Sequence, residues 1–459
     1  MKRIITCIMT LMWLTVAIAG NNVEVKIPDK CVDILLPDTA SYIVFLTDQK
    51  TSSKDNQMRL KVASLKDGQG LWAKKFYPGR YVGVCDQGVL LEDGFEIKLY
   101  DFKTGEEIRK LTHRLVFIDS ADDLMIGVKG SNSNKLKCSR LSTGETLWET
   151  KIDKNLGISW SEVDRPEPNT IIFQSDYIGK VNLVTGEIKT VGLNNSATDK
   201  KSFGLKMGAS ILGGALATLL TGGIILPVPY GVPHFYGLFS DMLAVNGRYY
   251  IADREGIYCF DTDLNRVWES PVPKGAGSRS FLYMRGDSIV MLNIGEALAP
   301  GRGAIKVGKP FRMSVNRSSG ESSNLCLFSE KWDTERFGKQ LDFVTSPVFI
   351  LDDKGESLSL LAFPEEGAYV YTPDGNLLHV DSDLNILDSI DEDMIYTVAA
   401  KFPDGYILRD TSDTPSFIRT DSDGKIIETY DSENIGFMTI GNHIFKYTDD
   451  ALILWDYKD

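Results

Sequence analysis

The sequence is poor in the residues that most often carry chemistry. It has four histidines, and none stands at the spacing of a metal site such as H-E-x-x-H: His113, His234, His379 and His443. No G-x-S-x-G pattern marks a nucleophile, and no serine or cysteine can be paired with a base. We therefore predict no catalytic residues, no metal site and no cofactor.

Cysteine is also scarce. The chain has six cysteines, no two of them adjacent, and an odd number remains once Cys7 is set aside. Without paired spacing, these residues indicate neither a disulfide framework nor a metal cluster. Cys138 and Cys259 each precede a turn residue by six positions, so we expect them in equivalent strands as small core residues.

Positive charge is in short supply, since 50 Lys and Arg stand against 63 Asp and Glu, for a net charge of −13. Residues 1–19 have a short basic start, an apolar run and a small-x-small end, which predicts a cleaved signal peptide, with a retained anchor as the alternative. No cysteine follows at the position of a lipid anchor. We expect an exported protein, periplasmic or associated with the cell envelope, with secretion as the alternative. Its acidity disfavours nucleic acid as a partner.

What the chain does have is a repeated pattern, clearest in KCSRLSTGETLWE at 137–149. An alternating run leads into a Thr-Gly turn, and a second short run carries Trp148. Glycine tolerates the positive φ of a tight hairpin turn. The turn glycines of four copies lie 37, 39 and 42 residues apart: Gly68, Gly105, Gly144 and Gly186. A period near forty with several short strands is typical of propeller blades.

We therefore predict an all-β fold, a single β-propeller over 20–459, with eight blades favoured and seven as the alternative. Turns at Asn265, Asn385 and Gly424 continue the repeat less regularly. The last strand, from Ala451, ends where a turn should follow, and VEVKIP at 23–28 has no place in any repeat. We predict that this N-terminal strand completes the C-terminal blade and closes the ring.

The pattern Asp-x-x-Thr-Gly-x-x-x-Trp, best matched at 101–105 and 143–148, resembles the repeat of PQQ-like (quinoprotein-type) β-propellers. The resemblance implies that Trp72, Trp148 and Trp268 dock neighbouring blades as core residues. Quinone dehydrogenases of that family carry a vicinal cysteine pair, which this chain lacks. The resemblance therefore favours the scaffold branch of the BamB-like kind.

One interval does not fit the repeat. Gly186 and Asn265 are 79 residues apart, about forty too many, and the excess is an apolar, Gly-rich insertion at 194–237. Its stretch 207–226 is twenty residues without a charge, long enough for one membrane-spanning helix. A single crossing would separate the two halves of one propeller, so we favour a helical hairpin broken at Gly213-Gly214. Three roles for 202–233 stay open: a lid on the propeller, contact with a membrane, or contact with a partner protein.

We predict an exported, non-enzymatic binding or assembly scaffold whose partner surface lies on 194–237 and 295–310. The apolar residues expected to contact a partner or membrane are Leu212, Leu216, Leu219, Leu220 and Ile224. The alternative is an enzyme, or a protein that binds a small molecule or glycan in the central channel. A convergent cluster of carboxylates or histidines at one mouth would favour that alternative.

One acidic stretch mimics a calcium loop. Asp381, Asp383 and Asn385 are followed by Glu392 at the twelfth position, but Ile386 stands where such a loop requires glycine. We expect these residues to form an Asx turn instead, as in the related turn that begins at Asp261.

Overall fold

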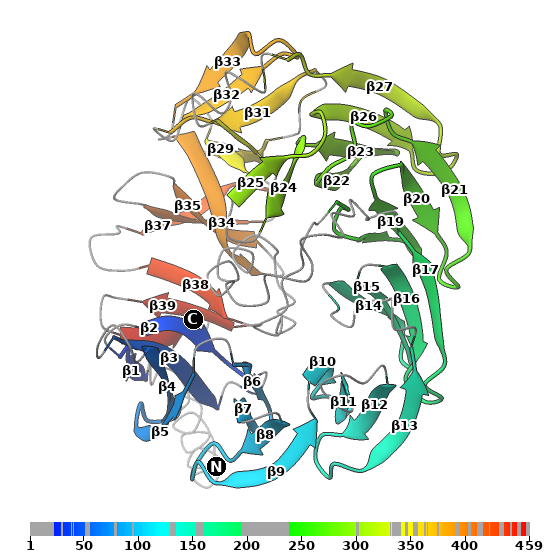
Figure 1. Cartoon of the computed structure of the whole chain (residues 1–459). Coiled ribbons are helices and arrows are strands. Elements are labelled where there is room, and N and C mark those ends of the chain that lie inside the picture. The colour runs from blue at the N-terminus through cyan, green and yellow to red at the C-terminus, as the bar shows by residue number, and fades with distance from the viewer. Residues whose placement is uncertain are drawn as a thin grey trace, which may run out of the picture.

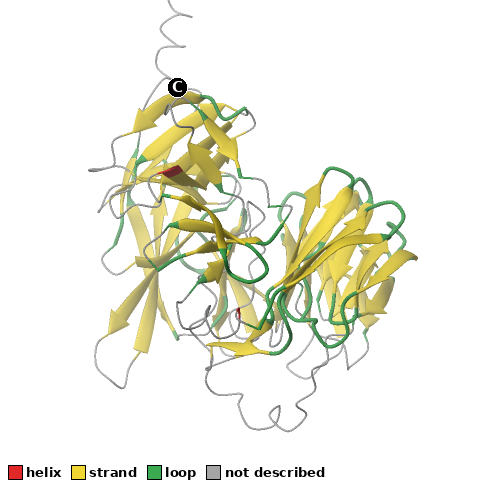
Figure 2. Ribbon diagram, turned by 90° about the horizontal axis from the view of Figure 1, so that it is seen from above, coloured by secondary structure: helices red, strands yellow, loops and turns green. Residues whose placement is uncertain are grey.

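The computed structural model describes residues 23–193 and 238–455, apart from short loop stretches, of which the longest are 51–55, 129–134, 153–159, 333–340, 352–356, 411–415 and 431–435. The predicted signal peptide 1–19 and the insertion 194–237 lie outside the described residues. Strands joined by loops make up nearly all of the described chain (Figure 2). Within this part, no helix has the length and apolar character needed to cross a membrane.

Nine sheets, numbered here as blades 1 to 9, follow one another around a ring in chain order (Figure 1). The fold is therefore an all-β propeller. In blades whose strands Figure 1 labels at both ends, such as blades 2, 3, 4 and 6, the first strand lies toward the centre of the ring and the fourth lies at the rim.

Blades 1 to 3 contain β2 (Cys31–Leu35), β3 (Tyr42–Lys50), β4 (Asn56–Ser64) and β5 (Gly70–Phe76); β6 (Val82–Cys85), β7 (Gly88–Asp93), β8 (Glu96–Tyr100) and β9 (Glu107–Thr112); and β10 (Arg114–Asp119), β11 (Leu124–Val128), β12 (Lys135–Arg140) and β13 (Thr146–Lys151). Blades 4 and 5 contain β14 (Glu162–Glu167), β15 (Thr170–Gln174), β16 (Tyr177–Asn182) and β17 (Ile188–Gly192); and β18 (Leu243–Val245), β19 (Arg248–Ala252), β20 (Gly256–Phe260) and β21 (Arg266–Pro271). Blade 6 contains β22 (Ser280–Arg285), β23 (Ser288–Asn293), β26 (Phe311–Asn316) and β27 (Ser322–Leu327), with a separate hairpin of β24 (Glu296–Ala299) and β25 (Gly303–Lys306).

Blade 7 contains β28 (Asp342–Phe343), β31 (Ala368–Tyr371), β32 (Leu377–Val380) and β33 (Ile386–Ile390). Blade 8 contains β34 (Ile395–Phe402), β35 (Gly405–Asp410), β36 (Phe417–Asp421) and β37 (Ile426–Tyr430), extended by β29 (Phe349–Leu351) and β30 (Leu358–Leu360). Blade 9 contains β38 (Gly436–Ile440), β39 (His443–Tyr447), β40 (Ala451–Trp455) and, from the other end of the chain, β1 (Glu24–Lys26).

The two ends of the chain close the ring, as the sequence predicted. Strand β1 pairs with β40 in antiparallel register, with Val25 opposite Leu452. Val25 is buried between two exposed neighbours. Closure gives β40 a partner for its outer edge, which would otherwise be open to pairing with other chains.

Buried apolar clusters hold the blades together. Each junction between neighbouring blades, including that between blade 9 and blade 1, contains one such cluster. At the closing junction, Val25 and Phe445 pack against Ile43 and Phe45. Among the described residues, the core is therefore distributed around the ring, with one cluster at each junction between blades.

The described residues form nine blades, so the prediction of eight, with seven as the alternative, is wrong. The turn at Ser319-Gly320 connects β26 and β27 of blade 6 and so marks a blade of its own between the turns at Asn265 and Asn385. The spacing is irregular there because β24–β25 interrupts blade 6 and β29–β30 interrupts blade 7. Strand β29 pairs with β34, so its hairpin belongs to blade 8. Whether a hairpin starts a new blade depends on which strand it pairs with. A local sequence pattern does not identify that partner strand.

Tryptophans of three outer strands contact the turn of the next blade. Their indole N–H groups donate to backbone carbonyls there at 2.8, 2.7 and 3.0 Å: Trp72 to Phe102, Trp148 to Leu183 and Trp268 to Arg317. Their rings lie so close to the turn glycines that an added Cβ atom would sit within 2.8 Å of them: Gly105, Gly186 and Gly320. The indole rings therefore lie between neighbouring blades, the position expected for residues that dock one blade on the next.

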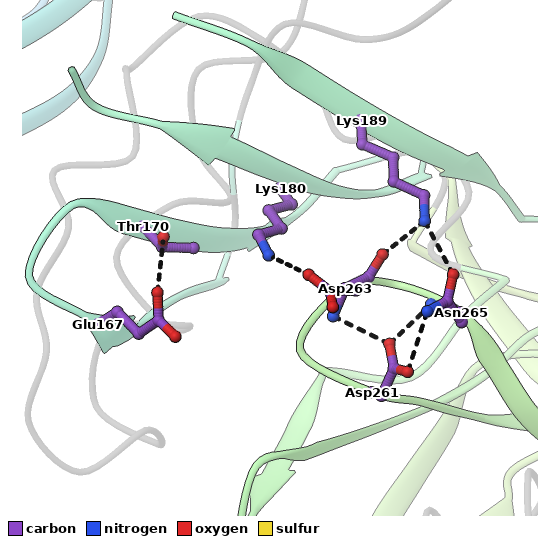
Figure 3. A network of polar contacts seen from close by, with 7 residues as sticks. All are labelled: Glu167, Thr170, Lys180, Lys189, Asp261, Asp263 and Asn265. Atoms are coloured by element: carbon purple, nitrogen blue, oxygen red, sulfur yellow. Dashed lines mark hydrogen bonds and ion pairs between the residues drawn. The ribbon is translucent and has the colours of Figure 1, made fainter. Parts of the chain in front are cut away.

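Blade 4 has no tryptophan in its outer strand, and charged residues make the equivalent contact (Figure 3). The Nζ atom of Lys180 lies 2.6 Å from Oδ1 of Asp263 in the turn of blade 5. Lys189 donates to the backbone carbonyl of Asp263 at 2.5 Å and to Oδ1 of Asn265 at 3.1 Å. The sequence pattern did not identify these lysines, because their partners come from the next repeat.

Candidate functional site

Three charged residues lie at the same end of three consecutive sheets. We call the end where the first strand of a blade begins and its fourth strand finishes the entry face. The opposite end, which carries the turn glycines, is the turn face. Glu162 begins β14 of blade 4, Asp241 precedes β18 of blade 5 and Arg279 precedes β22 of blade 6. All three therefore belong to the inner, entry-face edge of the ring.

Strand pairing and buried side-chain hydrogen bonds to the backbone hold Asp241 near Glu162. Glu162 pairs with Gln174 across β14 and β15, and Nε2 of Gln174 donates to the carbonyl of Ser240 in the next blade at 2.6 Å. The Ser240 hydroxyl accepts the amide N–H of Ala252 and donates to the carbonyl of Asp241, each at 2.9 Å. Gln174 and Ser240 are fully buried. A buried polar chain of this kind fixes the position of Asp241 relative to blade 4.

Arg279 is held by a second buried network. The Ser278 hydroxyl and Oδ1 of Asn293 lie 2.9 Å apart, and both side chains are fully buried. The Arg279 amide donates to the carbonyl of Glu296 at 3.1 Å, which ties it to the β24–β25 hairpin. Its guanidinium lies over the ring of Phe281, 5.1 Å from the ring centre.

The electrostatics of the three residues are coupled. Burial, and secondarily the charge of Asp241, raises the pKa of Glu162 from 4.5 to about 7. Asp241 keeps contact with solvent, yet the protein atoms around it raise its pKa by desolvation, while the positive charge of Arg279 opposes that rise. A carboxyl with a pKa near 7 can take or give a proton at physiological pH.

Glu162→Gln is expected to stabilise the protein at pH 8 and to leave its stability at pH 4 nearly unchanged. The unfolded chain releases the Glu162 proton near pH 4.5 and the folded chain near pH 7, so stability falls as the pH rises through that window. Glutamine removes this loss. Because Glu162 is half-buried, we expect a gain of about 1–2 kcal/mol. Urea unfolding at both pH values measures it, with Glu167→Gln, an exposed residue of the same strand, as the control. An equal effect at both pH values would contradict the assignment.

The outlying loops also emerge at the entry face. The described chain stops at Leu193, just after the outer strand of blade 4, and resumes at Leu238, just before the inner strand of blade 5. Leu193 packs in the cluster between these two blades, and Leu238 is fully buried. The hairpin β24–β25, within the predicted loop 295–310, leaves the same face of blade 6.

The predicted contact residues of the insertion lie outside the described residues: Leu212, Leu216, Leu219, Leu220 and Ile224. Glu162, Asp241 and Arg279 were not identified from the sequence. Their only local signal is that each lies near the start of an inner strand, and the ring is what brings them together.

Acidic side chains bond to their own turns at three places. Oδ1 of Asp381 accepts the amides of Asp383 and Asn385 at 2.8 and 2.9 Å, and Asp261 accepts those of Asp263 and Asn265 at 2.9 and 2.8 Å. Asp421 makes the same two contacts. The Asx-turn interpretation is therefore confirmed. Glu392 lies outside the described residues.

The cysteines are separate core or half-buried residues. All five described cysteines are free thiols. Cys138 pairs with Trp148 and Cys259 with Trp268 across neighbouring strands, and both cysteines are buried, which confirms their equivalent positions. Over 23–193 and 238–455, where described, no three His, Cys, Asp or Glu side chains are grouped for a metal ion.

Comparisons with known proteins assign no family. No family model matches the chain, and no curated protein is similar to it. Among solved structures, BamB from Moraxella catarrhalis is similar over 82% of this chain and 96% of its own, with 12% identity and a TM-score of 0.35. KlHsv2 with loop 6CD replaced by a Gly-Ser linker is similar over 87% of this chain and 98% of its own, with 7% identity and a TM-score of 0.28. A eukaryotic initiation factor is similar over 95% of this chain and 88% of its own, with 7% identity and a TM-score of 0.35. At these values the similarities assign neither a family nor a function to this chain.

Proposed function

We propose that this chain is an exported, non-enzymatic β-propeller of the PQQ-like type that acts as a binding or assembly scaffold in the periplasm or cell envelope, with secretion as the alternative. One observation carries the proposal. Two departures from the repeat, the insertion 194–237 and the β24–β25 hairpin, begin and end at the same face of neighbouring blades, whereas the β29–β30 hairpin interrupts blade 7 at the other face. Loops gathered on one face of a rigid ring are a common form of binding surface.

The insertion is the proposed contact element, through Leu212, Leu216, Leu219, Leu220 and Ile224. The residues on either side of the insertion lie at one face of one closed ring, where blades 4 and 5 pack together. This arrangement supports an insertion that contacts its target from one side, rather than one that crosses a membrane as a single helix. A lid on the entry face, a membrane surface and a partner protein remain the three roles to distinguish.

The test is a full-length protein compared with a variant in which a short Gly-Ser linker replaces 202–233. We expect affinity purification from the native envelope to recover specific partners only with the intact insertion. The double variant Leu212→Asp/Leu219→Asp should lose the same partners, and Thr218→Ser should keep them. Unchanged partners after the deletion would place the interface elsewhere, and a wild-type protein that fractionates as soluble without detergent would exclude the membrane role. Equal melting temperatures establish that the ring is intact.

A second candidate is favoured by the pairing of Glu162 with Asp241 beside Arg279. A carboxyl with a pKa near 7, here Glu162, beside a second carboxyl whose pKa is also raised suits acid–base chemistry or glycan binding at the mouth of a central channel. This function would be lost in Glu162→Gln and kept in the variant without 202–233. The scaffold function has the opposite dependence, so the two variants separate the candidates.

A further inference from the structure

A cavity of about 290 Å³ lies between blades 5 and 6 on the turn face, opposite the entry face. Blade 5 contributes Asn246 from its β18–β19 turn, Arg248 and Tyr250 from β19, and Cys259 from β20. Blade 6 contributes Arg317 and Ser318 from its β26–β27 turn. The cavity therefore sits at a junction of two blades, where propellers offer recesses with walls from both.

The cavity is cationic, although the chain carries a net charge of −13. Two guanidinium groups and no carboxylate line it. Among the described residues, no carboxylate forms an ion pair with Arg248. The nearby Asp261 is bound to its own turn through Asn265, with Oδ1 accepting the amide at 2.8 Å and Oδ2 the side-chain N–H at 3.1 Å. Asp287 lies 3.1 Å from Arg317 but outside the cavity lining.

The backbone at Arg317 is fixed in advance. Its carbonyl accepts the indole N–H of Trp268 at 3.0 Å and the hydroxyl of Tyr250 at 3.4 Å. Its amide donates to the carbonyl of Asp287 at 3.0 Å. Tyr250 and Cys259 are buried and form an inner wall that is mostly apolar. A charged rim above an apolar wall suits a small ligand with one charged end.

We propose that this cavity binds a small organic anion. A carboxylate or phosphate group would be held between Arg248 and Arg317, because the planar guanidinium matches both groups in charge and geometry. Asn246 and Ser318 would add neutral hydrogen bonds, and the carbon body of the ligand would rest against Tyr250. This site is independent of the proposed scaffold function and lies on the other face of the ring.

Isothermal titration of the full-length protein with inorganic phosphate, glucose 6-phosphate, glucuronate and neutral glucose tests the proposal. We expect saturable binding of at least one of the three anions, no binding of glucose, and weaker binding in high salt. Arg248→Gln should weaken binding about tenfold. Arg317→Lys, which keeps a cation beside Asp287, should weaken it as well. Which anion binds most tightly distinguishes phosphate from carboxylate as the recognised group.

The control is Arg266→Gln, which removes an exposed arginine of the same blade that pairs with Glu269. Its affinity should equal that of the wild type. Arg248 is exposed, so Arg248→Gln is expected to melt like the wild type without ligand. The proposal is overturned if none of the three anions binds, if Arg248→Gln and Arg266→Gln bind equally well, or if glucose binds as tightly as the anions.

Discussion

Val25→Asp is expected to destabilise the protein by about 4 kcal/mol, because it places an unpaired carboxylate in the junction between blades 9 and 1. Val25 is only 1% exposed and packs with Phe445 and Leu452 on one side and with Phe45 on the other. Loss of β1 would also leave the edge of β40 unpaired. The midpoint of urea unfolding, followed by tryptophan fluorescence, measures the effect.

The matched controls for Val25→Asp are its exposed neighbours in the same strand. Glu24→Gln and Lys26→Gln should change stability by less than about 0.5 kcal/mol. If Val25→Asp behaved like these controls, β1 would contribute little to closure of the ring. Aggregation of the variant at high concentration is a second expected consequence, because an open strand edge invites pairing between chains.

Gly186→Ala is expected to cost about 2–4 kcal/mol, and about half of that cost should disappear when Trp148 is absent. Gly186 has φ of +72°, and a Cβ there would lie 2.5 Å from the indole of Trp148 and 2.9 Å from Oγ1 of Thr150. The positive φ accounts for about 1 kcal/mol of the cost and the clash for the remainder. Trp148→Ala alone should cost about 3–5 kcal/mol, since it empties a buried position and leaves the Leu183 carbonyl without its donor.

A double-mutant cycle separates these two terms. In the Trp148→Ala background, Gly186→Ala should cost only about 1–2 kcal/mol, because the contact with Thr150 remains, so the coupling energy is about 1–2 kcal/mol. Gly275→Ala is the matched control, because Gly275 has φ of +74° but no atom within 4 Å of an added Cβ. It should cost about 1 kcal/mol in either background. Additive effects in the cycle would mean that the indole of Trp148 does not interact with the turn at Gly186.

The same contacts explain which parts of the fold could be predicted. The Thr-Gly turns, the alternating strands and Trp148 lie within a dozen residues of one another, so each copy of the pattern carries its own hairpin. Closure by β1 could be inferred because the N-terminal strand had no place in any repeat and the C-terminal blade lacked its outer strand. Cys138 and Cys259 were placed correctly for the same reason, since their distance from the turn sets their register.

The blade number, the candidate site and the cationic cavity depend on contacts between repeats. Hairpins β24–β25 and β29–β30 look like blade hairpins in sequence, and only the pairing of β29 with β34 shows that one of them extends an existing sheet. Glu162, Asp241 and Arg279 are neighbours because three blades stand side by side, while Arg248 and Arg317 meet across one junction. A turn or a strand follows from interactions among adjacent residues, whereas a site shared by blades depends on how the ring closes, and no single repeat contains that information.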